Sequence, residues 1–390
     1  MSWRRRFGND WGRLGLTFEC SGLPHWKNTQ WGCLTELKYG KSLKDYKHYN
    51  SQYLVFGTNG IIGTTEQPLC NHASVIIGRK GAYRGVHYSP NPFYAIDTAF
   101  YLEALKKDEF DYEWAYYSLS TVDINSMDSG SAIPSTSRED FYALHVALPP
   151  LNEQKGMVEI LSAFDNKIAN NNAINQRLEQ MAQAIFKSWF VDFEPTIKFT
   201  EAVQVLGGGT PKTSEPEFWN GNIPFFTPKD TLSSYVLTTE KSLTKLGLEN
   251  CNSRLFPVNT VFVTARGTVG KLALAGCPMA MNQSCYALIG NKGYGQFYVY
   301  HLALDTVSRL IHKASGAVFD AIVTRDFDSE MIPNPPFELI HVFEETVTPI
   351  YQTILNNMKE NMQLANLRDT LLPKLLSGEI EVPVNDKNSP

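Results

Sequence analysis

The chain repeats itself at a fixed offset of 186 residues. The offset is set by Pro150 and Pro336 (336 − 150 = 186), and the alignment continues without a gap in both directions. Identical residues recur at this offset in both halves: Gly81 and Gly267, Leu102 and Leu288, Pro149 and Pro335, Ile168 and Ile354, Asn171 and Asn357, Asn175 and Asn361, Leu178 and Leu364. Such a repeat predicts two copies of one structural unit about a pseudo-twofold axis, with two related but non-identical working surfaces.

The composition is that of an ordinary globular protein with more than one domain. The 390 residues are 43% hydrophobic and 19% charged, and a chain this long exceeds one ordinary core. No apolar run approaches the ~18 residues that span a bilayer, and no apolar stretch follows the basic N-terminus as a secretory signal requires. The six cysteines form no Cys-x-x-Cys pair, which argues against zinc. We expect a cytoplasmic protein with reduced thiols and no membrane contact.

The formal net charge is −5. This charge does not favour binding to nucleic acid, because affinity for a duplex depends on neutralising its phosphates. A DNA-binding function would therefore require either basic residues concentrated on one face or partners that supply part of the positive charge.

Composition along the chain predicts an α+β fold in which two similar mixed α/β domains alternate with two long helices. Gly, Pro and β-branched residues dominate the domains, whereas apolar residues at helical spacing dominate the helices. The expected segments are a first domain at 1–148, a central helix at 149–195, a second domain at 196–333, a C-terminal helix at 334–380 and a polar tail at 381–390.

The two helices are expected from Leu151 to Phe190 and from about Glu338 to Leu376, each ~60 Å long at 1.5 Å per residue. Pro349 falls inside the second helix and predicts an early kink or a late start. Each helix carries an apolar stripe, and pairing the two as an antiparallel coiled coil would bury both stripes. The residues expected at this interface, or at one with a partner protein, are Ile168, Asn171, Leu178, Ile185, Trp189, Ile354, Asn357, Leu364, Leu371 and Leu375.

Asparagines lie near the middle of both helices. Antiparallel pairing would bring Asn171 and Asn357 together at the crossing, with Asn175 and Asn361 about one turn to either side. Buried asparagine at a core position costs stability but fixes the register. The alternative is that these side chains face solvent, in which case the heptad frame is off by one residue.

The helix ends carry more apolar residues than one stripe needs. We expect the surplus to form an exposed surface for a partner protein. The residues concerned are Ile185, Phe186, Trp189, Phe190, Leu371, Leu372, Leu375 and Leu376.

Two motifs could indicate an enzyme. Asn334–Phe337 (NPPF) resembles the tetrapeptide with which amino-methyltransferases hold a flipped adenine or cytosine, but its repeat partner Leu148–Leu151 lacks the asparagine. A rigid lead-in to a helix explains both copies. Gly207–Lys212 lacks the spacing of a phosphate loop, and the histidines lack metal-ligand spacing. We expect no catalytic residues, no cofactor and no metal in this chain.

Basic segments recur after strand-like runs in both copies. Lys80 and Gly81 align with Arg266 and Gly267, and glycine there would let the backbone approach a ligand closely. Arginine and lysine in loops on a β scaffold suit contacts to DNA phosphates and grooves. The alternative for each residue is an ordinary solvated surface. The candidate DNA-binding residues are Lys41, Lys44, Arg79, Lys80, Arg84, Lys229, Arg266, Lys271, Asn282 and Gln283.

Next to these segments the polar residues differ between copies. Ile96 aligns with Asn282, and Asp97 aligns with Gln283. The difference is expected if the two copies read different targets, although neutral divergence would produce it as well.

Several motifs together resemble the specificity subunits of Type I restriction-modification systems. The most typical segment is Leu367–Glu379 (LRDTLLPKLLSGE). The others are Leu148–Gln154 (LPPLNEQ), Gly208–Pro211 (GGTP), Phe218–Pro224 (FWNGNIP), Arg266–Gly270 (RGTVG), Phe56–Gly60 (FGTNG) and Ile77–Gly81 (IGRKG). The resemblance covers nearly the whole chain and is weakest before Gly40.

The resemblance implies a non-catalytic subunit with two target-recognition domains that bind double-stranded DNA. Each domain would read one half of a bipartite, asymmetric target, and the helix pair would set the spacing. Two modification subunits carrying S-adenosylmethionine would methylate adenine, and restriction subunits would use ATP and Mg²⁺. The alternatives are a stand-alone DNA- or protein-binding adaptor and an amino-methyltransferase that uses Asn334–Phe337.

Overall fold

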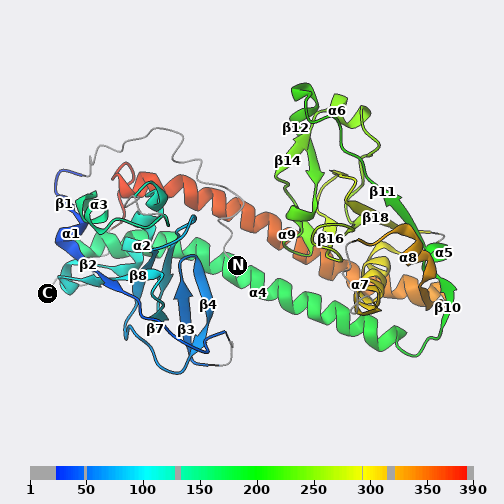
Figure 1. Ribbon diagram of the computed structural model, residues 1–390, viewed down its shortest axis with the longest axis horizontal. Coiled ribbons are helices and arrows are strands. Elements are labelled where there is room, and N and C mark those ends of the chain that lie inside the picture. The colour runs from blue at the N-terminus through cyan, green and yellow to red at the C-terminus, as the bar shows by residue number, and fades with distance from the viewer. Residues whose placement is uncertain (1–22, 48–50, 128–132, 292, 314–320, 384–390) are drawn as a thin grey trace. The chain divides into compact units, whose positions relative to one another are not determined.

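The computed structural model describes residues 23–47, 51–127, 133–291, 293–313 and 321–383 (Figure 1). The chain divides into two compact units, the first formed by Met1–Ile168 with Gln363–Pro390 and the second by Ala169–Met362. Each unit has its own sheets, helices and apolar core. The predicted α+β fold with two similar domains and two long helices is confirmed. The finer segment boundaries predicted from composition stay a prediction.

The first unit contains a four-stranded sheet in the order β2-β8-β5-β6, a three-stranded sheet β4-β3-β7 and a pair β1-β9. Its elements are β1 (Lys27–Gln30), α1 (Trp31–Leu34), β2 (Thr35–Tyr39), β3 (Tyr53–Gly57), β4 (Gly60–Thr65), β5 (Ser74–Gly78), β6 (Val86–Ser89), β7 (Phe93–Ala95), β8 (Ala99–Ala104), α2 (Tyr112–Ser120), α3 (Arg138–Ala143) and β9 (His145–Leu148).

The second unit contains a five-stranded sheet β11-β18-β15-β16-β13, a three-stranded sheet β14-β12-β17 and a pair β10-β19. Its elements are β10 (Pro195–Lys198), α5 (Phe199–Ala202), β11 (Val203–Gly207), β12 (Trp219–Phe226), β13 (Tyr235–Val236), β14 (Lys241–Leu243), α6 (Lys245–Glu249), β15 (Val261–Thr264), β16 (Leu272–Ala275), β17 (Ala280–Met281), β18 (Cys285–Gly290), α7 (Gln296–Lys313), α8 (Thr324–Ser329) and β19 (Met331–Pro333).

The repeat is visible element by element. The long helices α4 (Leu151–Phe190) and α9 (Phe337–Leu376) have 40 residues each and start at the predicted offset (337 − 151 = 186). Strands β2 and β11, however, start at Thr35 and Val203, an offset of 168. The second copy is therefore longer by 18 residues (186 − 168 = 18). Most of them lie between β12 and β15, because surface connections tolerate insertion.

Because of this change of offset, an ungapped alignment at 186 residues does not match the first strands of the two copies. The β1-α1-β2 segment matches β10-α5-β11 only after the 18-residue shift. The first domain thus has the same lead-in as the second, and both lead-ins pair with the strand that precedes a long helix, β9 or β19.

Parts of α4 and α9 pack antiparallel in the second unit through buried asparagines. Asn171 Nδ2 donates to Asn361 Oδ1 at 2.9 Å, and Asn357 Nδ2 donates to Asn175 Oδ1 at 2.8 Å. Asn171, Asn175 and Asn361 are buried, so the solvent-facing alternative is wrong.

The predicted contact between Asn171 and Asn357 is also wrong. The repeat offset relates one observed pair to the other (357 − 171 = 186 and 361 − 175 = 186). Each asparagine therefore bonds the residue one helical turn from its own repeat counterpart.

Helix α9 runs through Pro349 without a break (Figure 1), so the predicted late start is wrong. The exposed Pro349 lies between Val347 and Ile350, which are buried in the core of the second unit. Apolar packing of this face offsets the cost of the missing hydrogen bond.

Each unit covers much of the surplus apolar surface at the helix ends itself, so its role as a surface for a partner protein stays a prediction. Three of these residues are buried and five are half-buried. Phe186 stacks on His301 of α7 at 5.2 Å between ring centroids, and Leu372 and Leu375 are buried in the core that contains Trp114 of α2. Ile185, Trp189, Phe190, Leu371 and Leu376 lie in or against the same two cores. The surplus apolar residues thus attach each β domain to its helices. Among the described residues no helix is long and apolar enough to cross a membrane.

The asparagine pairs can be tested by a double-mutant cycle. Asn357→Leu should lower the free energy of unfolding by about 1–3 kcal/mol, because Asn175 Oδ1 is left buried without its donor. Asn175→Leu with Asn357→Leu should restore most of that loss. Urea unfolding measures all three, and Asn170→Leu at an exposed position is the control. Additive losses in the double variant would contradict the pairing.

His301 should make the second unit sensitive to acid. Burial lowers the pKa of His301 from 6.5 to about 4, while Tyr351 Oη lies 2.8 Å from its Nε2. Between pH 6.5 and pH 4 the imidazole is protonated in the unfolded chain but neutral in the folded chain. The free energy of unfolding therefore falls as the pH falls through this range, by about 3 kcal/mol in total. The loss is absent above pH 6.5 and complete below pH 4.

Urea titrations across this pH range should show a shallower decline for His301→Gln, which cannot take up the proton. Burial raises the pKa of Glu344 to about 6, which has the opposite effect on stability. Comparing the variant with the wild type cancels that contribution. Parallel pH profiles for the two proteins would refute the prediction.

Candidate nucleic-acid interface

In the first unit, loops from separate strands meet at one end of the sheets. Arg79 N, just after β5, donates to Thr98 O at 2.8 Å, and Thr58 Oγ1 in the β3–β4 turn donates to Lys80 O at 2.7 Å. Lys41 N, just after β2, donates to Ala95 O at 3.0 Å. These bonds hold four connections at one edge of the sheets: the loops after β2 and β5, the β3–β4 turn and the β7–β8 connection.

The second unit builds the same edge with the same backbone contacts. Ala265 N donates to Ser284 O at 2.8 Å and Gly209 N donates to Met281 O at 3.2 Å. Thr268 Oγ1 donates to Pro228 O at 3.4 Å, which joins the loop after β15 to the one after β12. The scaffold of the candidate interface is therefore duplicated.

The glycines singled out by the repeat have the expected conformational role. Gly81 has φ of +126° and Gly267 has φ of +81°, a region that side chains disfavour. Each follows a cation in an equivalent β-bridge, Lys80 with Ser135 and Arg266 with Ala321. Lys80 and Arg266 are both exposed, so the structure places these two candidates at equivalent positions.

The two remaining candidate cations of the second unit, Lys229 and Lys271, follow β12 and precede β16, respectively, at this edge. Lys271 is exposed. Lys229 follows β12, and its ammonium lies 3.5 Å from the carboxylate of Glu240. Both side chains of that pair are mostly exposed, so the ion pair contributes little and leaves Lys229 available to another anion.

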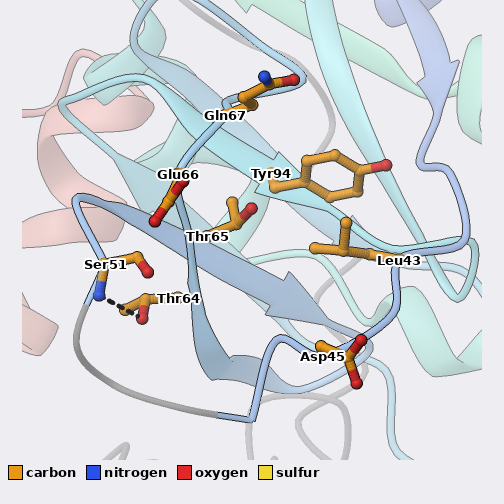
Figure 2. A pocket seen from close by; sticks show the side chains of 8 residues that line it. All are labelled: Leu43, Asp45, Ser51, Thr64, Thr65, Glu66, Gln67 and Tyr94. Carbon is orange, nitrogen blue, oxygen red and sulfur yellow. Dashed lines mark hydrogen bonds between the residues drawn. The ribbon is translucent and has the colours of Figure 1, made fainter.

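Lys41 and Lys44 are exposed in the loop after β2. This loop borders a polar hollow lined by Leu43, Asp45, Ser51, Thr64, Thr65, Glu66, Gln67 and Tyr94 (Figure 2). The carboxylates of Asp45 and Glu66 accept hydrogen bonds but repel phosphate. The hollow therefore suits a donor group and not an anion.

The structure contradicts the expectation that Arg84 binds DNA. Its side chain is buried, and its guanidinium donates to the carbonyl oxygens of Gly81, Ile124, Asn125 and Met127. A guanidinium that satisfies backbone acceptors inside the unit cannot also reach a duplex. Arg84 fixes the loop that carries Lys80.

The polar residues that differ between the copies lie in two equivalent connections. Asp97 lies between β7 and β8, and Asn282 and Gln283 lie between β17 and β18. Asp97 and Gln283 are both exposed, whereas Asn282 Oδ1 accepts from Ser284 N at 3.0 Å within its own turn. Gln283 Oε1 accepts a hydrogen bond from Thr210 Oγ1. Sequence reasoning missed Thr210 and Thr58. The loop after β11, which carries Thr210, matches the loop after β2 only at the 168-residue offset of the lead-in. Thr58 lies at this edge through its hydrogen bond to Lys80 O, a tertiary contact.

Asn334 has a structural partner. Its Oδ1 accepts from Tyr294 Oη at 2.7 Å, and Pro335 is buried where the chain enters α9. The tetrapeptide is a helix lead-in, as the repeat predicted. Among the described residues, no group of three or more His, Cys, Asp or Glu side chains could hold a metal ion.

The sequence matches a family described as the Type I restriction modification DNA specificity domain twice, at residues 26–180 and 191–365. A specificity subunit of the enzyme MjaIX from Methanocaldococcus jannaschii is 24% identical over 87% of this chain and 86% of its own length. The HindI specificity subunit from Haemophilus influenzae is 25% identical over 63% and 71%.

A solved structure shares the fold. The S subunit of a Type I restriction-modification system from M. genitalium superposes with a TM-score of 0.61 at 18% identity, covering 90% of this chain and 96% of that one. Both matched domains contain one copy of the duplicated edge. The chain therefore belongs to the Type I restriction-modification DNA specificity family, as a non-catalytic subunit that recognises the DNA target.

Proposed function

We propose that the two duplicated edges each read one half of a bipartite, asymmetric DNA sequence. The observation that supports this most strongly is that both edges have the same backbone scaffold but carry different side chains. Lys80 and Arg266 occupy equivalent bridges, while Asp97 stands where Gln283 stands in the other copy. Two identical edges would favour a palindromic target, whereas two different ones favour an asymmetric target.

The exposed polar side chains suit different bases. Glutamine can bond the N6 and N7 edge of adenine, whereas aspartate accepts from the N4 amino group of cytosine. Lysine and arginine beside them suit phosphate oxygens or guanine. Each edge thus holds one group for base readout among several cations.

The chain would act by directing partner subunits to the target. Two modification subunits, one for each copy of the repeat, would carry S-adenosylmethionine and methylate adenine. Restriction subunits would use ATP and Mg²⁺. Binding between such partners also fits the net charge of −5, because the partners would supply part of the charge that neutralises the phosphates. A complex of this kind would work in the cytoplasm.

Methylome sequencing of the host tests this function. A bipartite motif with methyladenine in each half should be modified in the wild type and unmodified after in-frame deletion of this gene. A plasmid copy should restore it. Methylation that survives the deletion would contradict the function, and the stand-alone adaptor would then be favoured.

Replacing the two differing residues should alter the two half-sites separately. Gln283→Ala should relax readout in one half of the motif, and Asp97→Ala should relax it in the other, each costing about 1–3 kcal/mol of discrimination. The measurement is the fraction of methylated sites for each single-base variant of the motif. Each variant serves as the control for the other. Loss of both halves from one substitution would contradict independent readout.

A further inference from the structure

An aromatic ring in the first unit is contacted by two guanidinium groups. The Arg79 guanidinium carbon lies 4.9 Å from the ring centroid of Tyr39, and that of Arg138 lies 5.2 Å from it. Arg79 also lies 5.7 Å from the Phe100 ring. Arg138 Nη2 donates to Tyr142 Oη at 2.8 Å. The two cations are therefore at most about 10 Å apart, each held by an aromatic contact.

Neither cation is neutralised by the residues that the structure describes. Among those residues, no carboxylate forms an ion pair with Arg79 or Arg138, and Arg79 Nη1 donates only to the backbone carbonyl of Asp97, at 2.8 Å. Both guanidinium groups stay charged at any physiological pH. Tyr39 remains 48% exposed, so the cluster faces solvent. Two like charges held this close favour an anion between or beside them.

The cluster adjoins the candidate interface. Arg79 directly precedes Lys80, and its backbone carbonyl accepts from Thr136 N at 2.8 Å beside the bridge that holds Lys80. Tyr39 ends β2, one residue before Gly40 and two before Lys41. A ligand that covers Lys41 and Lys80 would therefore also meet this cluster.

The described residues at the matching positions of the second unit do not form this cluster. At the offsets that relate the copies, Tyr39 corresponds to Gly207, Arg79 to Ala265, Arg138 to Thr324 and Tyr142 to Asp328. Asp328 instead accepts hydrogen bonds from Thr200 Oγ1 and Lys198 Nζ. The two units share a scaffold but differ in this feature.

We propose that Arg79 and Arg138, held by Tyr39, bind a backbone phosphate of the DNA, so that the first unit has a sequence-independent phosphate contact with no counterpart at the matching positions of the second unit. Arginine presents a rigid fork of donors that matches phosphate oxygens. Phosphate contacts position a protein on the duplex and carry no sequence information. This inference rests on the proposed function, because it assigns part of the affinity for the same ligand to one edge.

The test measures binding of the full chain, in the complex in which it purifies, to two fluorescent duplexes over a salt series. One duplex carries the methylated motif and the other has mixed sequence. Arg79→Gln with Arg138→Gln should weaken both equally and reduce the slope of log K against log salt by about 0.9 for each phosphate that the variant no longer neutralises. Arg138→Lys, which keeps the charge, should reduce the slope less.

Lys107→Gln is the matched control, since it removes one charge in the same unit at the other end of β8, where Lys107 pairs with Glu103. Its salt slope should equal that of the wild type. An unchanged slope in the double variant would overturn the phosphate site, and so would weaker binding confined to the duplex that carries the motif. If the wild type binds neither duplex, the proposed function fails and the phosphate site fails with it.

Discussion

Pairing between segments of α4 and α9 through buried asparagines is the constraint on which the rest of the second unit depends. An apolar seam alone lets two helices slide by one turn, because every register buries similar surface. The bonds from Asn171 to Asn361 and from Asn357 to Asn175 exist in one register only. A slip would leave several buried amide groups without partners, at about 1–3 kcal/mol each.

The domains attach to the helices by chemistry that differs between the copies. In the first unit Tyr117 Oη of α2 donates to Asp165 Oδ2 at 2.7 Å, and Asp165 also pairs with Arg368 of α9. Tyr351 and Ala182 occupy the positions of Asp165 and Arg368 in the second unit, where Tyr351 bonds His301 of α7. One set is ionic and the other neutral, so exchanging the domains would remove the hydrogen bond from Tyr117 to Asp165 and leave that carboxylate with Arg368 alone.

Recognition uses the opposite arrangement, in which the backbone is shared and the side chains diverge. Glycines with positive φ and matching bridges hold Lys80 and Arg266 in the same place. Asp97 and Gln283 differ on that shared frame, and so do Arg79 and Ala265. A rigid frame with exchangeable side chains lets one copy change its readout without disturbing the other.

The repeat, the limits of both long helices and the equivalence of Lys80 with Arg266 could be predicted from the sequence, because helical periodicity and the 186-residue offset can both be read directly from the order of residues. Three features depended on tertiary packing. The guanidinium of Arg84 turns inward to backbone carbonyls, the apolar helix ends lie under α2 and α7, and Tyr39 meets Arg79 and Arg138 from three separate segments. Whether a cation or an apolar side chain faces solvent depends on which distant segment covers it, and spacing along one segment carries no information about that contact.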